Sequence, residues 1–243
     1  MTSETPKPIS PFKYSDKVQL PILTRGRRLL RWLVNSLVRL IVKLSTRATV
    51  TGLENVPLDG PVLLVANHLG DIDDLLKVAF LPRQIEAIAK ADFLDYPFLG
   101  RLLDAYGVIW IRRGQPDRQA LRAALHGLAE GRMVMINPEG RESLSGAMEE
   151  ATNGAAFLAV KSSAPILPLA ITGTQNNPFY ANLRRLRRTR VTFHVGEPFY
   201  LATNPASDIP AAKDRQQAIE QGTQTIMIKI AALLPQENRG FYQ

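Results

Sequence analysis

VLLVANHLGDID, residues 62–73, is the stretch that decides the fold and holds the candidate chemistry. Its apolar first half has the length and the valine content of a buried strand, and Gly70 allows a sharp turn after it. The residues that follow Asp73 have the apolar spacing of a short helix. His68 is therefore predicted at the carboxyl end of a strand and Asp73 in the first helical turn, at the edge where open α/β sheets bind ligands.

His68 and Asp73 together suit proton-transfer chemistry. A carboxylate can fix the tautomer of an imidazole, and the imidazole can then take a proton from a hydroxyl group near neutral pH. A simpler interpretation has the histidine in a loop and the aspartate capping the helix. The spacing by itself favours the simpler interpretation, so the other motifs of the chain decide between the two.

The composition narrows the class of protein. With 243 residues, the chain is long enough for one large domain or for one domain with an appendage. A net charge of +8 and a pI of about 9.9 indicate an anionic partner, namely nucleic acid, a membrane surface or a phosphorylated or CoA-type substrate. The absence of cysteine excludes a thiol nucleophile, a disulfide framework and a cysteine-based zinc site. The three histidines are far apart in sequence, and no metal site is predicted.

Two segments precede the main domain, which is expected over residues 47–243. Residues 1–24 are polar and rich in proline, which is typical of a flexible lead-in, and they lack the apolar core of a secretory signal. The protein is therefore expected on the cytoplasmic side of a membrane. Residues 25–46 follow as a predicted amphipathic helix with one broad apolar face and one basic face.

Three interpretations compete for residues 25–46. A transmembrane span would place Arg31 and Arg39 near the bilayer centre, at a cost of roughly 2.5–3.5 kcal/mol each. A helix packed only on its own domain is the second interpretation. A basic amphipathic helix in the membrane interface, with Trp32 near the head groups, fits the pattern best and is compatible with the second.

The rest of the chain alternates apolar runs with helical segments, which predicts a single α/β domain. We expect a mixed, largely parallel sheet flanked by helices on both faces and preceded by the N-terminal amphipathic arm. Pro168, within an apolar run, indicates an edge strand or a bulge. The basic run at residues 183–190 is either a solvated turn or a patch for anionic lipid, CoA phosphates, an acidic acyl carrier protein or nucleic acid.

Four motifs, in order from about residue 51 to about residue 174, resemble the signatures of the glycerolipid acyltransferase family. This family is often called the 1-acylglycerol-3-phosphate, or lysophosphatidate, acyltransferase family. The first motif is His68 followed five positions later by Asp73, with Gly70 where the family often has serine. The second is an apolar strand that ends near Arg113.

The third motif, residues 137–143, reads NPEGRES and resembles the family's usual FPEGTRS. Asn137 replaces the phenylalanine. Arg141 and Glu142 replace threonine and arginine, so the basic residue has moved by one position. The fourth motif, residues 163–174, resembles the family's apolar strand with an early proline. The common order of all four motifs is what makes the resemblance specific.

The resemblance implies O-acyl transfer from a thioester, either acyl-CoA or acyl carrier protein, to the free hydroxyl of 1-acylglycerol-3-phosphate. The product would be phosphatidate, and no further cofactor is expected. His68 would take the hydroxyl proton, and Asp73 would orient His68. Binding of the acceptor and its phosphate falls to Arg113, Glu139, Gly140 and Arg141.

Other functions stay open from the residues alone. Within the same class, the acceptor is alternatively glycerol-3-phosphate or another lysophospholipid. A non-catalytic lipid-binding module at the membrane surface would keep the same fold, although the intact His68 and Asp73 favour an enzyme. A nucleic-acid binder rests only on charge, and nucleic acid is not an expected partner. The expected partners are a phospholipid surface at its cytoplasmic face, a lysophospholipid acceptor and the acyl donor.

Overall fold

A computed structural model describes residues 18–112, 114, 117–201 and 212–243. Within these residues lies a seven-stranded sheet with the order β1-β7-β6-β2-β5-β3-β4. All neighbouring strands are parallel except β6 and β7, so the prediction of a mixed, largely parallel sheet is confirmed. The strands are β1 (Thr46–Thr51), β2 (Val62–Ala66), β3 (Ile85–Lys90), β4 (Ile109–Ile111), β5 (Met133–Ile136), β6 (Ile166–Thr172) and β7 (Thr189–Val195).

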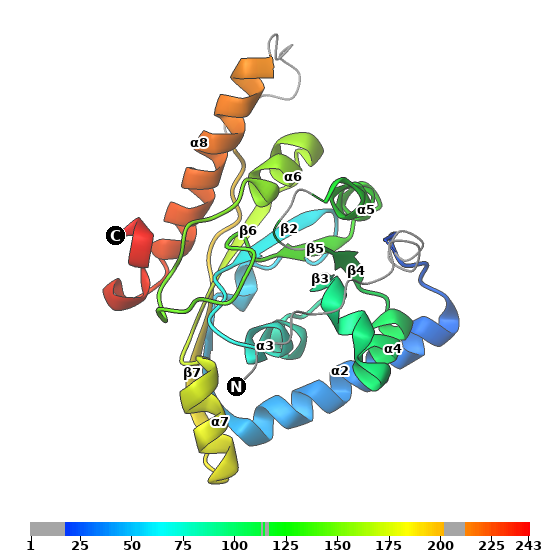
Figure 1. Ribbon diagram of the computed structural model, residues 1–243, viewed down its shortest axis with the longest axis vertical. Coiled ribbons are helices and arrows are strands. Elements are labelled where there is room, and N and C mark those ends of the chain that lie inside the picture. Colours follow the sequence, from blue (N-terminus) through cyan, green and yellow to red (C-terminus); the bar gives the residue numbers. More distant parts are fainter. Residues whose placement is uncertain (1–17, 113, 115–116, 202–211) are drawn as a thin grey trace, which may run out of the picture.

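Helices cover both faces of this sheet (Figure 1). One face packs against α5, α6 and α8, and the other packs against α2, α3 and α7. The described helices are α2 (Arg25–Ser45), α3 (Ile72–Phe80), α4 (Pro97–Tyr106), α5 (Arg118–Ala129), α6 (Gly154–Ser162), α7 (Asn176–Arg184) and α8 (Ala212–Ala231). Short 3-10 turns occupy Leu53–Asn55, Ala91–Asp95, Gln236–Asn238 and Gly240–Tyr242.

β2 is the central strand of the sheet and is buried on both faces, as its unbroken apolar run predicts. Leu63 and Val65 point into the core that contains α5, α6 and α8. Val62, Leu64 and Ala66 point into the core that contains α2 and α3. Because both faces of β2 are packed, its carboxyl end holds the next residues in a fixed position.

Pro168 lies inside the sheet, so the edge-strand alternative is wrong. β6 pairs with β2 on one side, where Pro168 is opposite Val65, and with β7 on the other. The ladder with β7 ends at Leu169, and beyond it the Pro168 carbonyl accepts a hydrogen bond from the Gly196 amide (2.8 Å). The N–H that proline lacks therefore falls where the regular ladder with β7 has already stopped.

α2 is fixed to the domain by a buried ion pair. Val38 and Val42 pack into the core beside α3, and Arg31 is 1% exposed. The Arg31 guanidinium donates two hydrogen bonds to the Glu86 carboxylate of β3 (2.7 and 3.0 Å) and two more to backbone carbonyls at the end of α4 (2.8 Å each). Each guanidinium nitrogen of Arg31 and both oxygens of Glu86 therefore have a hydrogen-bond partner, which is what a buried charge requires.

The opposite side of α2 carries an exposed apolar stripe, although the same leucines would form the core side of an ordinary amphipathic helix. The stripe comprises Leu29, Trp32, Leu33, Leu37, Leu40, Ile41 and Leu44. In the part of the chain that the structure describes, no helix is both long enough and apolar enough to cross a bilayer. α2 therefore packs on its own domain through one side and presents large apolar side chains on the other.

We expect Arg31→Met to lower the free energy of unfolding by about 3–5 kcal/mol, because the buried Glu86 carboxylate would lose its principal partner. Urea unfolding measures the change. Arg28→Met is the matched control, since Arg28 lies on the exposed side of the same helix. The double variant Arg31→Met/Glu86→Leu should recover part of the loss. Equal effects of the two single arginine substitutions would contradict this account.

Candidate active site

The turn between β2 and α3 is held at both of its ends. Asn67, the first residue after β2, is fully buried and bridges to β6. Its side chain accepts a hydrogen bond from the Ile171 amide and donates one to the Ile171 carbonyl (2.8 Å each). At the other end, the Asp73 amide donates to the Gly70 carbonyl (3.0 Å) as α3 begins. His68 lies between these two fixed points.

The His68 side chain contacts the Asp73 carboxylate, with Nδ1 and Oδ2 separated by 3.0 Å. The same carboxylate oxygen accepts hydrogen bonds from the amides of Leu69 (2.6 Å) and Gly70 (3.0 Å). Asp73 is fully buried and His68 is 3% exposed. With Nδ1–H donating to a carboxylate, Nε2 is the ring nitrogen left to accept a proton. The predicted pair is therefore in direct contact, and its geometry suits a general base.

Gly70 has no room for a side chain. A Cβ at this position would lie 2.2 Å from the Thr174 carbonyl oxygen and 2.7 Å from Asn176 Oδ1. The first of these atoms belongs to the backbone, so a larger residue would displace the segment that follows β6. Glycine in place of the family's usual serine is therefore a steric requirement of this chain.

Glu139 uses both of its carboxylate oxygens within the protein. Oε1 accepts a hydrogen bond from the His68 amide (3.1 Å), and Oε2 accepts one from the Glu149 amide (2.8 Å). The residue is 5% exposed, and Gly140 after it has a positive φ of 72° that favours glycine. Burial raises the pKa of Glu139 to about 7, although both backbone donors lower it. Glu139 thus joins the His68 turn to the loop that carries Glu149.

Of the two arginines predicted to bind the acceptor's phosphate, the structure describes only Arg141. Arg141 is largely exposed and forms an ion pair with Glu149 (2.6 Å). An acceptor phosphate would have to compete with that carboxylate for the guanidinium. Arg113 lies outside the described residues, so its predicted role stays a prediction.

Of the carboxylates in the described part of the chain, that of Glu142 lies nearest to Nε2 of His68, and the sequence did not single it out. Its Oε1 lies 4.0 Å from His68 Nε2, and its Oε2 accepts a hydrogen bond from Asn176 Nδ2 (2.8 Å). Asn176 also accepts a hydrogen bond from the Asp71 amide (2.9 Å). The one available signal was the replacement of the family's arginine by an acidic residue at this position of the third motif.

A buried lysine also contacts the third motif. Lys77 of α3 has no exposed surface and donates hydrogen bonds to Asp74 (2.9 Å) and to Asn137 (2.7 Å). Burial acts to raise the pKa of Asp74, but the charge of Lys77, then that of His68, outweighs it and leaves this pKa below its ordinary value. A phenylalanine at position 137 could not accept this hydrogen bond, so the departure of Asn137 from the family pattern matches the buried ammonium group.

Among the described residues, no group of three or more histidine, aspartate and glutamate side chains is arranged to hold a metal ion. The polar groups around His68 instead form a carboxylate-rich set of hydrogen bonds centred on one imidazole. Such an arrangement can accept a proton from a bound hydroxyl and stabilise the resulting imidazolium.

Comparison with known proteins defines the class to which this fold and this site belong. The sequence profile of the family described as Acyltransferase matches residues 47–172, which is more than half of the chain. The chain belongs to this acyltransferase family. The match includes His68, Asp73 and the whole third motif.

Individual relatives narrow the comparison. A 1-acyl-sn-glycerol-3-phosphate acyltransferase of Borreliella burgdorferi is 30% identical over 163 residues, covering 66% of this chain and 61% of that protein's length. The alpha form of this enzyme from Bos taurus is 29% identical over 197 residues, covering 79% of this chain and 68% of the relative. A crystal structure of the 1-acyl-sn-glycerophosphate acyltransferase of Thermotoga maritima shares the fold, with a TM-score of 0.57, 23% identity and coverage of 84% and 83%.

The raised pKa of Glu139 predicts a pH-dependent contribution to stability. Because the pKa in the folded state lies near 7 and the ordinary value is 4.5, the folded protein binds more protons than the unfolded chain between these values. The contribution of Glu139 is therefore complete below about pH 4.5 and is lost as the pH rises through 7.

Glu139→Gln removes this titration. As the pH rises from 5 to 8, the original protein loses the contribution of Glu139 and the variant does not. The free energy of unfolding of the variant minus that of the original protein should therefore increase over this range, by no more than about 3 kcal/mol. Urea unfolding at each pH measures the difference. Glu142→Gln is the control, since Glu142 is partly exposed. A constant offset between Glu139→Gln and the original protein would show that Glu139 does not titrate in this range.

Proposed function

We propose that this protein transfers a fatty acyl group from a thioester to the free hydroxyl of 1-acylglycerol-3-phosphate and so forms phosphatidate. The observation that carries the proposal is the contact between His68 Nδ1 and the fully buried Asp73 carboxylate, 3.0 Å apart, at the carboxyl end of the central strand. Membership of the acyltransferase family and the activity for which the relatives are named support the same reaction.

In the proposed mechanism, the acceptor hydroxyl lies against His68 Nε2. Its oxygen attacks the thioester carbonyl carbon while Nε2 takes the hydroxyl proton. Asp73 stabilises the imidazolium and holds the ring in place. When the tetrahedral intermediate collapses, the C–S bond breaks, an ester bond remains, and the imidazolium returns its proton to the departing thiolate. No covalent acyl-enzyme forms, and the chain has no cysteine to carry one.

The acceptor's phosphate is proposed to bind Arg113 and Arg141, beside the backbone of Gly140. Arg141 is exposed and its present partner is Glu149, so exchange of that carboxylate for a phosphate needs only a side-chain movement. Glu139 acts in this proposal by positioning the His68 backbone, because each of its oxygens accepts a hydrogen bond from a backbone amide, one of them that of His68.

Glu142 favours a second candidate acceptor. A carboxylate 4.0 Å from His68 Nε2 can accept a hydrogen bond from a second donor group near the reacting hydroxyl. Glycerol-3-phosphate, which keeps a second hydroxyl beside the one that reacts, and a lysophospholipid with an ammonium head group both supply such a donor. These acceptors therefore belong in the same assay.

The reaction is tested by thioester consumption in mixed micelles, with 1-acylglycerol-3-phosphate, glycerol-3-phosphate and lysophosphatidylethanolamine as parallel acceptors and with CoA and carrier-protein donors. His68→Ala should abolish turnover, and Asp73→Asn should reduce it by about 10⁴-fold because the ring would lose its anionic partner. His126→Ala, on the exposed side of α5, is the control. Turnover that persists in His68→Ala would remove His68 as the base. Absence of turnover with every acceptor and donor would favour a non-catalytic lipid-binding module.

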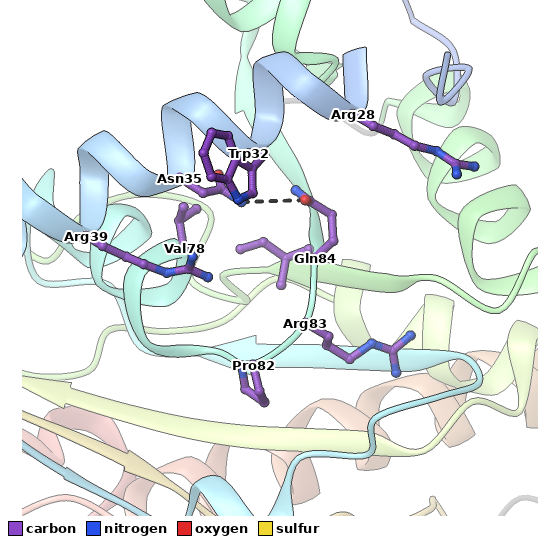
Figure 2. Close-up of a pocket in the computed structure, with 9 residues that line it drawn as sticks. Arg28, Trp32, Asn35, Arg39, Val78, Pro82, Arg83 and Gln84 are labelled. Carbon is purple, nitrogen blue, oxygen red and sulfur yellow. Dashed lines mark hydrogen bonds between the residues drawn. The ribbon is translucent and has the colours of Figure 1, made fainter. Parts of the chain in front are cut away.

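We further propose that α2 lies in the interface of a phospholipid membrane, at its cytoplasmic face. The exposed apolar stripe of α2 supports this placement, and Trp32 is 62% exposed. Figure 2 shows the adjacent pocket between α2 and the segment from α3 to β3, where Trp32 lies between Arg28 and Arg39. Its volume is about 170 Å³. Arginines beside an indole suit the level of anionic head groups.

The double variant Leu37→Ser/Leu40→Ser should weaken binding to anionic vesicles by about tenfold or more, because each leucine contributes roughly 1.5–3 kcal/mol when its side chain is fully buried. Vesicle sedimentation measures the binding, and the urea midpoint should stay unchanged since both side chains are exposed. Leu58→Ser is the matched control, because Leu58 is an exposed leucine that lies outside α2. Equal losses in control and double variant would argue against an interfacial α2.

A further inference from the structure

The outer face of β1 and β7 is polar and open. Along β7, Val191, Phe193 and Val195 point into the core shared with α2, so the residues between them point to the other side of the sheet. Arg190 and Thr192 are exposed there. Together with β1 and the end of β6, they form a groove of about 680 Å³, which lies within the range of ligand sites. Its lining is Arg47, Ala48, Thr49, Thr172, Arg188, Arg190, Val191 and Thr192.

Two arginines of this groove lie directly side by side. Arg47 of β1 is the register partner of Arg190 of β7, and the two strands are parallel. Like charges at opposed positions destabilise a sheet, and none of the described residues that line the groove is acidic. Arg188 adds a third guanidinium, oriented by a hydrogen bond from its Nε to the Thr46 carbonyl (2.7 Å). Such a cluster is complementary to an anion with several oxygens, such as a phosphate.

Hydroxyl groups complete the lining. Thr49 is the register partner of Thr192, and Thr172 of β6 pairs with the same residue from the other side. The hydroxyls of Thr172 and Thr192 are hydrogen-bonded to each other. One of these two hydroxyls donates to the other, so the hydroxyl that accepts, together with that of Thr49, keeps an O–H to donate to a phosphate oxygen. The groove therefore combines fixed positive charge with neutral donors on a rigid sheet.

The groove is connected to the His68 turn by a short segment. Thr172 is the last residue of β6, and Gly173 lies so close to the Arg190 carbonyl that a Cβ would approach it to 2.2 Å. The carbonyl of the next residue, Thr174, closes over Gly70, two positions after His68. A ligand held by the groove therefore lies beside the segment that borders the candidate active site.

We propose that this groove binds the phosphate groups at the nucleotide end of an acyl-CoA donor, while the thioester at the other end of the extended pantetheine arm reaches His68. The inference rests on the proposed function, because only a thioester-using enzyme needs such a donor. A lipid head group fits the groove less well, because the groove opens on the face of the sheet opposite to α2. A compact cluster of three guanidinium groups also suits the phosphates of a small ligand better than the broad surface of a carrier protein.

The decisive comparison is between two donors with the same acyl group, acyl-CoA and acyl-pantetheine, of which the second lacks all phosphates. In Arg47→Ser/Arg190→Ser, the KM for acyl-CoA should rise by about 10- to 100-fold, as expected for lost charge-assisted hydrogen bonds. The KM for acyl-pantetheine and the kcat for both donors should stay unchanged. Arg118→Ser/Arg122→Ser on α5 removes the same net charge from exposed positions and should change neither KM.

A second measurement does not depend on turnover. Equilibrium binding of adenosine 3′,5′-bisphosphate to the full chain should weaken by a similar factor in Arg47→Ser/Arg190→Ser and stay unchanged in the α5 control. Because the substitution removes a like-charge pair, the urea midpoint should stay the same or rise. A lower midpoint would give the two arginines a structural role instead.

Several outcomes would overturn the proposal. Equal KM changes for acyl-CoA and acyl-pantetheine, or no change for either, would exclude a nucleotide site. A loss confined to acyl carrier protein would assign the groove to that protein, and a loss of vesicle binding would assign it to lipid. If the original protein transfers no acyl group from any donor, the proposed function fails, and bisphosphate binding still decides whether the groove is a phosphate site.

Discussion

The interaction on which the site depends is the convergence of three donors on one oxygen atom of Asp73. The imidazole of His68 and the amides of Leu69 and Gly70 all meet this atom, which has no access to water. Three donors compensate a buried negative charge that would otherwise be expensive. They also wrap the turn around the carboxylate, so the same contacts shape the backbone and orient the ring. The same three hydrogen bonds therefore fix the backbone at the start of α3 and orient the imidazole of His68.

Much of this could be predicted from sequence because it depends on local patterns. The apolar run before Asn67 defines a central strand, and the placement of His68 and Asp73 around the turn follows from it. What could not be predicted depends on contacts between distant segments. The third motif shows this for Glu139, whose oxygens are both taken by backbone amides, and for Glu142, which Asn176 holds beside the imidazole. Neither arrangement leaves a periodic or compositional signal in one sequence.

The side of α2 that faces the sheet also could not be predicted from the sequence, because it depends on a contact between distant segments. A helical projection identifies an apolar side, but it does not state whether that side faces the sheet or the surroundings. Here the buried contact is made by valines and by Arg31, whose guanidinium finds Glu86 on β3 and so tolerates complete burial. The leucines are left outside. One charged contact between segments 55 positions apart thus determines which side of the helix the protein offers to its environment.

Gly70 sets how closely two segments far apart in sequence can approach. The turn after β2 and the segment after β6 meet where a Cβ at position 70 would lie 2.2 Å from the Thr174 carbonyl oxygen and 2.7 Å from Asn176 Oδ1. Any larger residue could enter only if the backbone after β6 retreated at the same time. The absence of one methyl group therefore determines the spacing between the two strands' carboxyl ends beside His68.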